Sequence, residues 1–508
     1  MFAKVNTAHL EGIEPVLVEV EANISSMGLP SFSVVGLAET SIKESKERVK
    51  SALKNFGFNI FAKPIIINLA PADFKKEGTH YDLPIAVVLL LAAGYLNANV
   101  DDTFFIGELS LDGKIRGVRG VLPFTIFAKE MGFKRVILPE ENINEAGIID
   151  GIDILGFKSL DEVIGYVNGE VKKEPVKIDI NELLSDEEEH LDFSDVKGQF
   201  AVKRAAEIAA SGMHNFIMIG SPGSGKSMIA KRIPTIMPSM TIDEIIETTK
   251  IHSVAGRLLK KNGIVSKRPF IAPHHTASDV SIIGGGRDAK PGAVSLAHNG
   301  ILFCDEVLEF KKSVLEVLRQ PLEDRVVTVS RANRTVVYPA NFMFVAACNP
   351  CPCGYLGDSK RECVCTQAQI QRYRAKLSGP LMDRIDIQVQ VSSIDIKELS
   401  KLQPGESSAS IRERVEAARK IQQERFKEEG ILYNSQMSEK LIRKYCKLDS
   451  ESIKLMEQAV TKMGLSARAY SKILKVARTI ADLENSENIS SKHLLEAIQY
   501  RILDKDYF

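Results

Sequence analysis

The segment Gly220 to Ser227, GSPGSGKS, constrains this chain more than any other. It has the spacing G-x-x-x-x-G-K-[ST], it follows the apolar run NFIMIG, and it precedes a helical run that begins MIAKRI. A glycine-rich turn between a buried strand and a helix lets backbone amides point at phosphate oxygens. The helix N-terminus adds its positive dipole end. The sequence therefore predicts an α/β core with a phosphate-binding loop.

Each residue type in this loop suits a magnesium nucleotide. Lys226 is expected to neutralise the β- and γ-phosphate oxygens, and Ser227 to hold Mg²⁺. The alternative is a glycine-rich loop that only turns the chain. The eight residues predicted to bind ATP are Gly220, Ser221, Pro222, Gly223, Ser224, Gly225, Lys226 and Ser227.

Two further strand-like runs end in polar residues that such a site needs. GILFCDE (300 to 306) ends in Asp305, expected to bind Mg²⁺ through water, and Glu306, expected to polarise the attacking water. The alternative is that both acids cap the next helix. FMFVAACNP (342 to 350) places Asn349 at its carboxyl end, where it could orient the water or simply form a turn before Pro350.

The length of 508 residues predicts several domains in a multidomain α/β protein. We expect an α/β domain at 1–170, a charged linker at 171–191, an ATPase core at 192–395 and a helical domain at 396–508. The apolar fraction of 44% and the charged fraction of 26% are those of a globular protein. Because the formal net charge is zero, any contact with nucleic acid would need local basic patches.

The N-terminus is broken by charges, which argues against a secretory signal, and the apolar run Ile85 to Ala93 is too short to span a bilayer. We therefore expect a cytoplasmic protein without a membrane partner, whose seven cysteines are reduced thiols or metal ligands. Four of them form two C-x-C pairs that are separated by nine residues, within an insertion at 348–365. Cys348 could compete with Cys351 as a metal ligand. A structural Zn²⁺ site and free thiols are both open. The four cysteines are Cys351, Cys353, Cys363 and Cys365.

These motifs, with SGPLMDRIDI (378 to 387) and SARAYSKILKVART (466 to 479), resemble AAA+ ATPases of the magnesium-chelatase-like group. PFIAPHHTASDVSIIGGG, PGAVSLAHNGILFCDE and AACNPCPCGYLGDSKRECVC are similar to the ComM (YifB-type) subfamily of branch-migration ATPases, over essentially the whole chain. The resemblance implies that Arg384 is an arginine finger for a neighbour's γ-phosphate and that Arg468 is the second sensor, from a helical lid. It also implies a hexameric ring. Without the family, Arg384 could equally form a surface ion pair.

The first 170 residues resemble the ribosomal S5 and Lon-protease-like fold in KKEGTHYDLPIA (75 to 86) and GELSLDGKIRGVRGVLP (107 to 123). His80 stands where such a protease has its nucleophilic serine, and Leu122 where it has its lysine. Covalent peptide cleavage then has no nucleophile or base. We expect a module for binding a protein partner or for assembly.

VVTVSRANRTVVYP (326 to 339) is typical of a β-hairpin that turns near Ala332 and Asn333. In related helicase-type rings such a hairpin enters the central pore, so Arg331 and Arg334 could bind DNA phosphates. A solvated hairpin, or one that touches a protein substrate, is equally open.

Two other basic groups stand out. Lys472, Lys475 and Arg478 share one helical face with Arg468 and could contact phosphate, although such a stripe is usually a solvated face. The adjacent His274 and His275 lack a third ligand nearby and are assigned to structure or to signalling between subunits.

The leading hypothesis is an ATP hydrolase that drives DNA unwinding or branch migration in recombination or natural transformation. Its rival is a chelatase-like ATPase that remodels a partner protein. A nucleotide switch without hydrolysis is disfavoured, because a switch has no need for Lys226, Glu306, Asn349 and Arg384 together.

Overall fold

The computed structural model describes residues 1–183, 191–258, 263–286, 289–331, 334–358, 361–377, 379–392, 403–501 and 503. The chain forms two compact units. The first combines Met1–Ser185 with Ile242–Ser266, and the second combines Asp186–Thr241 with Lys267–Phe508. The segment 242–266 therefore interrupts the second unit in sequence while it packs with the first in space.

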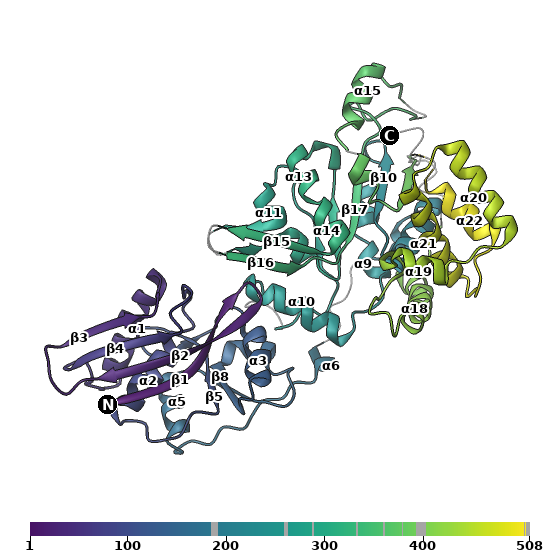
Figure 1. Cartoon of the computed structure of the whole chain (residues 1–508). Coiled ribbons are helices and arrows are strands. Elements are labelled where there is room, and N and C mark those ends of the chain that lie inside the picture. Colours follow the sequence, from purple (N-terminus) through teal and green to yellow (C-terminus); the bar gives the residue numbers. More distant parts are fainter. Residues whose placement is uncertain are drawn as a thin grey trace. The chain divides into compact units, whose positions relative to one another are not determined.

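The first unit is built on a seven-stranded sheet in the order β3-β4-β2-β1-β5-β8-β9. The strands β1 and β2 form a long antiparallel hairpin, clear in Figure 1, while β5, β8 and β9 run parallel to β1. A small ribbon of β6 and β7 lies outside the sheet. The strands are β1 (Phe2–Glu11), β2 (Glu14–Ile24), β3 (Ser31–Val35), β4 (Pro64–Ala70), β5 (Thr103–Phe105), β6 (Glu108–Leu109), β7 (Ile115–Arg116), β8 (Arg135–Pro139) and β9 (Asp153–Phe157).

The helices of the first unit include one that is almost wholly apolar and buried, α2, which contains the run Ile85 to Ala93. This run is the centre of the unit's core, because it packs on β1 and β2. In the part of the chain that the structure describes, no helix has both the length and the apolar character that a membrane crossing requires. The helices are α1 (Thr40–Asn55), α2 (Asp82–Ala93), α3 (Val121–Glu130), η1 (Glu140–Asn142), α4 (Ile143–Ala146), α5 (Leu160–Val167), α6 (Ile180–Leu183) and α10 (Ile242–Val254).

Helix α10 belongs to the first unit because it packs against α3. The buried carboxylate of Glu145 accepts hydrogen bonds from the Ser253 hydroxyl of α10 and, at 2.8 Å, from the amide of Leu122 at the start of α3. One buried acid thus joins two segments that are far apart in the sequence.

The second unit contains a five-stranded parallel sheet in the order β11-β14-β17-β10-β18. In a parallel sheet all carboxyl ends meet at one edge, which is where α/β proteins bind their ligands. The strands are β10 (Phe216–Gly220), β11 (Phe270–Ile271), β14 (Ile301–Cys304), β17 (Met343–Cys348) and β18 (Ile387–Val391). The surrounding elements are η2 (Phe193–Asp195), α7 (Phe200–Gly212), α8 (Lys226–Ala230), α9 (Ile233–Ile236), α11 (Asp279–Ile283), β12 (Gly284–Gly285), β13 (Lys290–Pro291), α12 (Ala293–Leu296), η3 (Val307–Glu309), α13 (Lys312–Val317), α14 (Arg319–Asp324), α15 (Gln367–Arg374) and α16 (Gly379–Met382).

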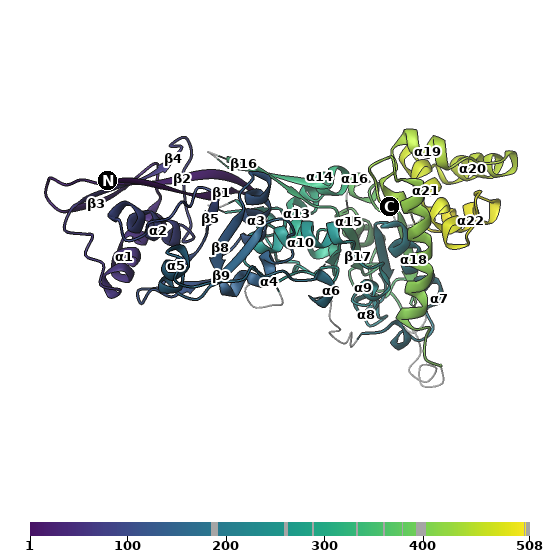
Figure 2. The ribbon, with the colours of Figure 1, turned by 90° about the horizontal axis from the view of Figure 1, so that it is seen from below.

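The C-terminal helices share one hydrophobic core with this sheet, and Figure 2 shows α18 beside α7. Polar contacts join the C-terminal helices to α7 and to the residues before β10. The Gln422 side-chain amide donates to Ser211 O at 2.9 Å, and His214 Nε2 lies 2.8 Å from Thr479 Oγ1. The helical domain is therefore held firmly against α7 and the start of β10. Its elements are α18 (Ser408–Arg425), η4 (Asn434–Gln436), α19 (Glu439–Tyr445), α20 (Ser450–Met463), α21 (Ala467–Leu483) and α22 (Ser491–Gln499).

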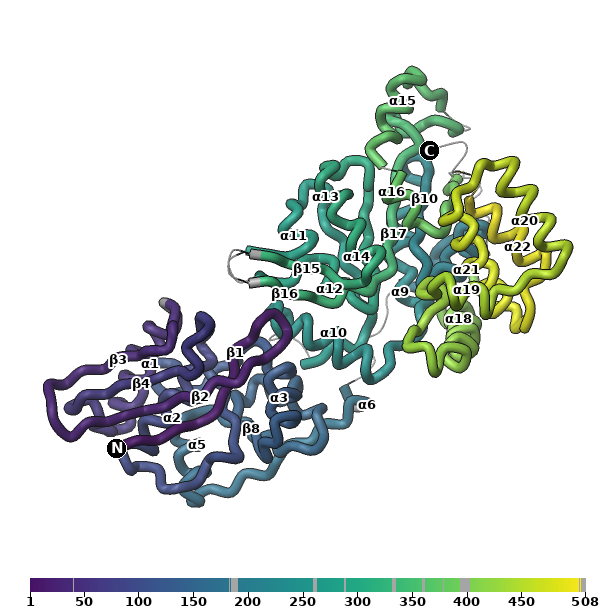
Figure 3. The backbone as a smooth tube through the Cα atoms, viewed as in Figure 1, coloured from purple at the N-terminus to yellow at the C-terminus, as the bar shows by residue number. Residues whose placement is uncertain are grey.

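The predicted hairpin is present as the antiparallel pair β15 (Val326–Arg331) and β16 (Arg334–Pro339), traced side by side in Figure 3. Arg331 pairs with Arg334 at the last register position. The turn expected near Ala332 and Asn333, and the side chains of Arg331 and Arg334, lie outside the described residues.

Candidate active site

The glycine-rich loop lies between β10, which ends at Gly220, and α8, which begins at Lys226. Gly223 and Gly225 adopt φ angles of 76° and 92°, which favour glycine. A Cβ on Gly220 would lie 2.3 Å from the carbonyl oxygen of Val391. These glycines let the backbone form the tight cradle that the spacing predicted.

The Lys226 ammonium lies inside this loop and donates to Gly220 O at 2.7 Å and to Ser221 O at 2.9 Å. It also lies 3.3 Å from Asn349 Oδ1, so the loop and the end of β17 share one cation. Burial lowers the pKa of Lys226, while the nearby Asp305 and Glu306 carboxylates act in the opposite direction.

Ser227 and the acids after β14 form the second half of the site. The Ser227 hydroxyl donates to Asp305 Oδ2 at 2.6 Å, and the Glu306 amide donates to Asp305 Oδ1 at 3.0 Å. A hydroxyl next to a carboxylate supplies the oxygen ligands that Mg²⁺ prefers. The cradle, the lysine and these two oxygens fit a magnesium nucleotide.

Glu306 has a strained backbone, with φ of 48°, and its side chain is 56% exposed. A non-glycine residue in the left-handed region is uncommon, and such strain clusters at functional sites. The Glu306 carboxylate is open to solvent and takes no part in the hydrogen bond that joins Ser227 to Asp305. That arrangement suits a group that must polarise a water molecule.

Two side chains near the site were not predicted to belong to it. His275 Nδ1 lies 4.0 Å from Glu306 Oε2, and its ring packs on that of His274. Gln199, with φ of 55°, donates from Nε2 to Ser392 O at 2.7 Å and to Ser224 O at 3.4 Å. The adjacent histidines were noticeable in the sequence, whereas Gln199 was not. That His275 lies near Glu306 could not be predicted without the fold.

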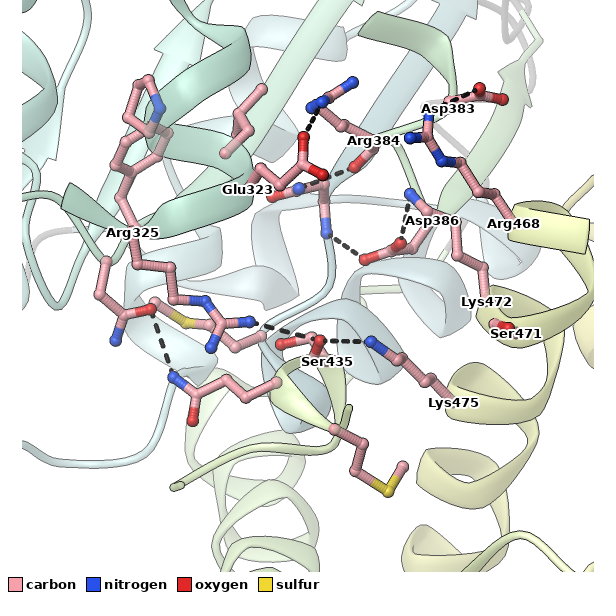
Figure 4. Close-up of a pocket in the computed structure, with 18 of the residues that line it drawn as sticks. Glu323, Arg325, Asp383, Arg384, Asp386, Ser435, Arg468, Ser471, Lys472 and Lys475 are labelled. Carbon is pink, nitrogen blue, oxygen red and sulfur yellow. Dashed lines mark hydrogen bonds and ion pairs between the residues drawn. The ribbon is translucent and has the colours of Figure 1, made fainter. Parts of the chain in front are cut away.

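Arg384 and Arg468 line one cavity of about 340 Å³, drawn in Figure 4. The Arg384 guanidinium donates to Pro380 O at 2.6 Å and pairs with Glu323. Arg468 is 61% exposed and lies 3.5 Å from Asp383. The structure thus brings both predicted arginines together, each held by a carboxylate of its own chain.

Three more cations line this cavity: Arg325, Lys472 and Lys475. Arg325 and Lys475 both donate to Ser435 O, at 3.3 Å and 3.0 Å, as Figure 4 shows. Lys472 pairs with Asp386 at 2.8 Å.

Arg478 differs from the other members of the stripe. Its side chain is only 3% exposed and pairs with Asp482 at 3.0 Å. The suggestion that Arg478 contacts phosphate is therefore wrong, because the guanidinium is buried inside the helical domain.

The arginine cavity and the glycine-rich loop lie at opposite edges of the sheet. Asn215, just before β10, donates from Nδ2 to Arg384 O at 2.8 Å, whereas the loop follows the other end of that strand. The five residues of β10 alone span about 16 Å at the usual strand rise. Arg384 and Arg468 are therefore too far from their own chain's loop to contact the same phosphate.

Comparison with known proteins shows the family of the chain. Three family models match the chain: "Magnesium chelatase, subunit ChlI" over residues 192–399, "Subunit ChlI of Mg-chelatase" over 20–142, and "Magnesium chelatase, subunit ChlI C-terminal" over 405–501. The chain is 42% identical to the competence protein ComM of Haemophilus influenzae, over 97% of this chain and 96% of that protein. The chain belongs to the magnesium-chelatase-like AAA+ family, in its ComM/YifB group. It is also 42% identical to YifB of Escherichia coli K12, over 99% of this chain and 97% of YifB.

The four spaced cysteines of the chain lie in one cluster. The Sγ atoms of Cys351, Cys353, Cys363 and Cys365 all lie within 4.8 Å of one another, and three of the pairs are separated by 3.4, 3.6 and 3.6 Å. Four thiolates around a tetrahedral Zn²⁺ would lie about 3.8 Å apart, given Zn–S bonds near 2.3 Å. Cys348 is buried in β17, where burial raises the pKa of its thiol to about 12, and it is not part of the cluster.

The first unit has a Lon-like fold, and the chain is 32% identical over 183 residues to Lon protease 2 of Bacillus subtilis, a match that covers 32% of this chain and 33% of that protein. His80 is buried, with Nε2 2.9 Å from Ala8 O, and burial lowers its pKa to about 4. Leu122 is fully buried in α3. His80 and Leu122, the two residues expected in place of the protease serine and lysine, thus pack inside the unit.

Proposed function

We propose that this chain is an ATP hydrolase whose subunits form a hexameric ring and move DNA. The observation that carries the proposal is the separation of the nucleotide loop from the arginine cavity at opposite edges of one sheet. A chain built in this way needs a second copy to complete its site, because the arginines can only reach a nucleotide held by a neighbour. A closed ring gives every subunit such a neighbour.

The residues of the loop would hold the nucleotide. Backbone amides from Gly220 to Gly225 and the Lys226 ammonium would bind the phosphates, and Ser227 with Asp305 would hold Mg²⁺. The bound Mg²⁺ would supply charge neutralisation at the phosphate oxygens. The Lys226 ammonium already lies inside the loop, and it would exchange its partners Gly220 O and Ser221 O for the phosphate oxygens.

The remaining groups would act on the attacking water and on the negative charge of the γ-phosphate. Glu306 would accept a hydrogen bond from the water and polarise it, and Asn349, already beside Lys226, would orient it. Arg384 of the neighbouring subunit would stabilise charge on the γ-phosphate, with Arg468 beside it. Both arginines must exchange their carboxylate partners Glu323 and Asp383 for the neighbour's phosphate.

DNA is proposed as the substrate that the ring moves. The hairpin β15–β16 carries Arg331 and Arg334 at its end, next to each other in the register, which supplies the local positive charge that a neutral chain needs to hold phosphates. The name of the relative in Haemophilus influenzae, competence protein ComM, supports a role in natural transformation or recombination. We place the protein in the cytoplasm, which suits seven cysteines that form no disulfide in the described structure. We assign the first unit to partner binding or assembly.

One specific observation favours a second candidate, a protein-remodelling ATPase. Family models of a magnesium chelatase subunit match three separate stretches of the chain, including residues in both units. A zero net charge also suits a protein substrate as well as DNA.

We also propose that the cysteine cluster binds one structural Zn²⁺. The spacing of the sulfur atoms matches a tetrahedral thiolate site, and four cysteines leave no open position for water. The metal would close the 351–365 loop and take no part in hydrolysis.

The deciding experiment measures ATP turnover with and without single-stranded or branched DNA. We expect DNA to stimulate turnover, and Arg331→Ala with Arg334→Ala to remove the stimulation while leaving basal turnover intact. Arg443→Ala, which removes an exposed arginine of α19, is the control for lost charge and should keep the stimulation. Turnover that DNA leaves unaltered would count against the DNA motor and favour the remodelling ATPase.

A further inference from the structure

The loop that carries the cysteines packs directly on the nucleotide loop. Gly354 has φ of 86°, and a Cβ on it would lie 2.7 Å from Cδ and 2.8 Å from Cγ of Pro222. The same Cβ would lie 3.9 Å from Cγ of Asn349. One glycine of the cysteine loop thus lies against both the nucleotide loop and the residue proposed to orient water.

The chain between the site and the cluster is short. Asn349, which lies 3.3 Å from the Lys226 ammonium, is followed by Pro350 and then by Cys351. Pro350 O accepts from Arg374 Nε at 3.2 Å, and Cys351 O accepts from Gly354 N at 3.0 Å in a tight turn. The position of this turn is therefore set by Arg374 on one side and by the cysteine cluster on the other.

We propose that the metal site of Cys351, Cys353, Cys363 and Cys365 is a positioning element of the nucleotide site. The metal fixes the turn 351–354, and the turn supports Pro222 from outside and keeps Asn349 against Lys226. This inference rests on the proposed Zn²⁺ site and adds that ATP binding depends on it.

The physical reason is the close packing of the sulfur atoms. Without a cation, four thiolates within 4.8 Å of one another, with three of the pairs only 3.4 to 3.6 Å apart, would repel one another and move apart. This movement releases the turn from the cluster and leaves Arg374 as its remaining anchor. Catalytic groups lose much of their effect when displaced by about 1 Å, so a modest shift of Pro222 and Asn349 should be measurable.

The loop offers a matched pair of variants. Gly354→Ala places a methyl group against Pro222 but changes no cysteine. Gly357→Ala imposes the same kind of backbone strain, at φ of 77°, where the added Cβ would meet only Gln390 Nε2, at 3.8 Å. The two substitutions differ mainly in contact with the nucleotide loop.

The test measures the zinc content and the Kd for a fluorescent ATP analogue in the full-length protein. We expect one zinc per chain in all glycine variants, a Kd raised roughly tenfold in Gly354→Ala, and a Kd within about twofold of the parent in Gly357→Ala. Cys363→Ser, or removal of zinc by a chelator, should raise the Kd as Gly354→Ala does. Circular dichroism checks that each protein remains folded.

Different failures are distinguishable. If zinc is present but its removal and Gly354→Ala both leave the Kd unchanged, the coupling is overturned while the zinc site stands. If the purified protein lacks metal and Cys363→Ser binds ATP as the parent does, the zinc site and the coupling both fall. Neither result touches the DNA motor, which the stimulation experiment tests separately.

Discussion

The Ser227 hydroxyl lies 2.6 Å from a carboxylate oxygen of Asp305, although the two residues are 78 positions apart in the chain. Parallel strands β10 and β14 bring them to the same edge of the sheet, with β17 between them. In the proposed site Mg²⁺ would be bound at this contact, and the next residue, Glu306, would act on water.

Glu306→Gln should separate binding from hydrolysis. The amide preserves the size of the side chain but cannot polarise water as a carboxylate does, so ATP turnover should fall by about 10² to 10⁴. The Kd for ATP should stay near that of the parent, because Ser227 and Asp305 are untouched. A variant that still hydrolyses ATP at the parental rate would remove Glu306 from the mechanism.

Lys226→Ala should instead weaken binding itself. The substitution removes the only cation in hydrogen-bond contact with the described nucleotide loop, and the carbonyls Gly220 O and Ser221 O lose the hydrogen bonds that the ammonium donates. We expect little detectable binding of a fluorescent ATP analogue at concentrations that saturate the parent. Lys231→Ala, in the turn after α8, is the control and should bind normally. Equal affinity in the parent and Lys226→Ala would contradict the proposed site.

His80 should make the first unit sensitive to acid. Burial lowers the pKa of His80 to about 4, against about 6.5 in an unfolded chain. Between these two pH values the imidazole is protonated in the unfolded state and neutral in the folded state. The folded state therefore loses stability as the pH falls from about 6.5 to 4, by up to about 3 kcal/mol. Hydrogen exchange of the β1 amides, followed in the full chain at pH 7 and pH 4.5, would measure this loss. His80→Gln should reduce it, and an identical pH dependence in both proteins would refute the assignment.

Asp386 should contribute to the free energy of unfolding of the fold around the arginine cavity. Burial alone would raise its pKa, but Lys472 and His214 outweigh burial and hold it well below the ordinary range of a carboxyl group. The resulting stability is present above a pH of about 4 and is lost as the pH falls further. Asp386→Asn leaves Lys472 buried without its partner, which typically costs about 3 to 5 kcal/mol.

Thermal and urea unfolding of the full chain would test this expectation. Asp383→Asn is the matched control, since Asp383 pairs with the exposed Arg468 and should contribute about 1 kcal/mol or less. Equal stability of the two variants would mean that Asp386 is not held as described.

The sequence predicted those parts of the site that depend on neighbouring residues in the chain. The glycine-rich loop, the acids after β14 and the hairpin β15–β16 each carry a local pattern, and the structure has all three as expected. The four cysteines also came together as their spacing indicated.

What the sequence could not predict depends on packing between distant segments. The sequence predicted that segment 242–266 belongs to the ATPase core. In the structure the segment packs with the first unit, where the Ser253 hydroxyl donates a hydrogen bond to Glu145. Arg478 shares a helical face with Arg468 but is buried by its pairing with Asp482, four residues further along the same helix. Periodicity places residues on a face and cannot say which face a distant helix will cover.

The assembly of each site from two subunits is the central claim, and mixing two inactive variants tests it most directly. Glu306→Gln keeps its arginines, while Arg384→Ala keeps its own loop and acids, and each protein alone should bind ATP with turnover reduced by 10² or more. In rings reassembled from equal amounts, about a quarter of the interfaces would pair an intact loop with an intact arginine, so about a quarter of parental turnover should return. A mixed sample that assembles but stays inactive would contradict the account, because both arginines would then have to act within their own chain.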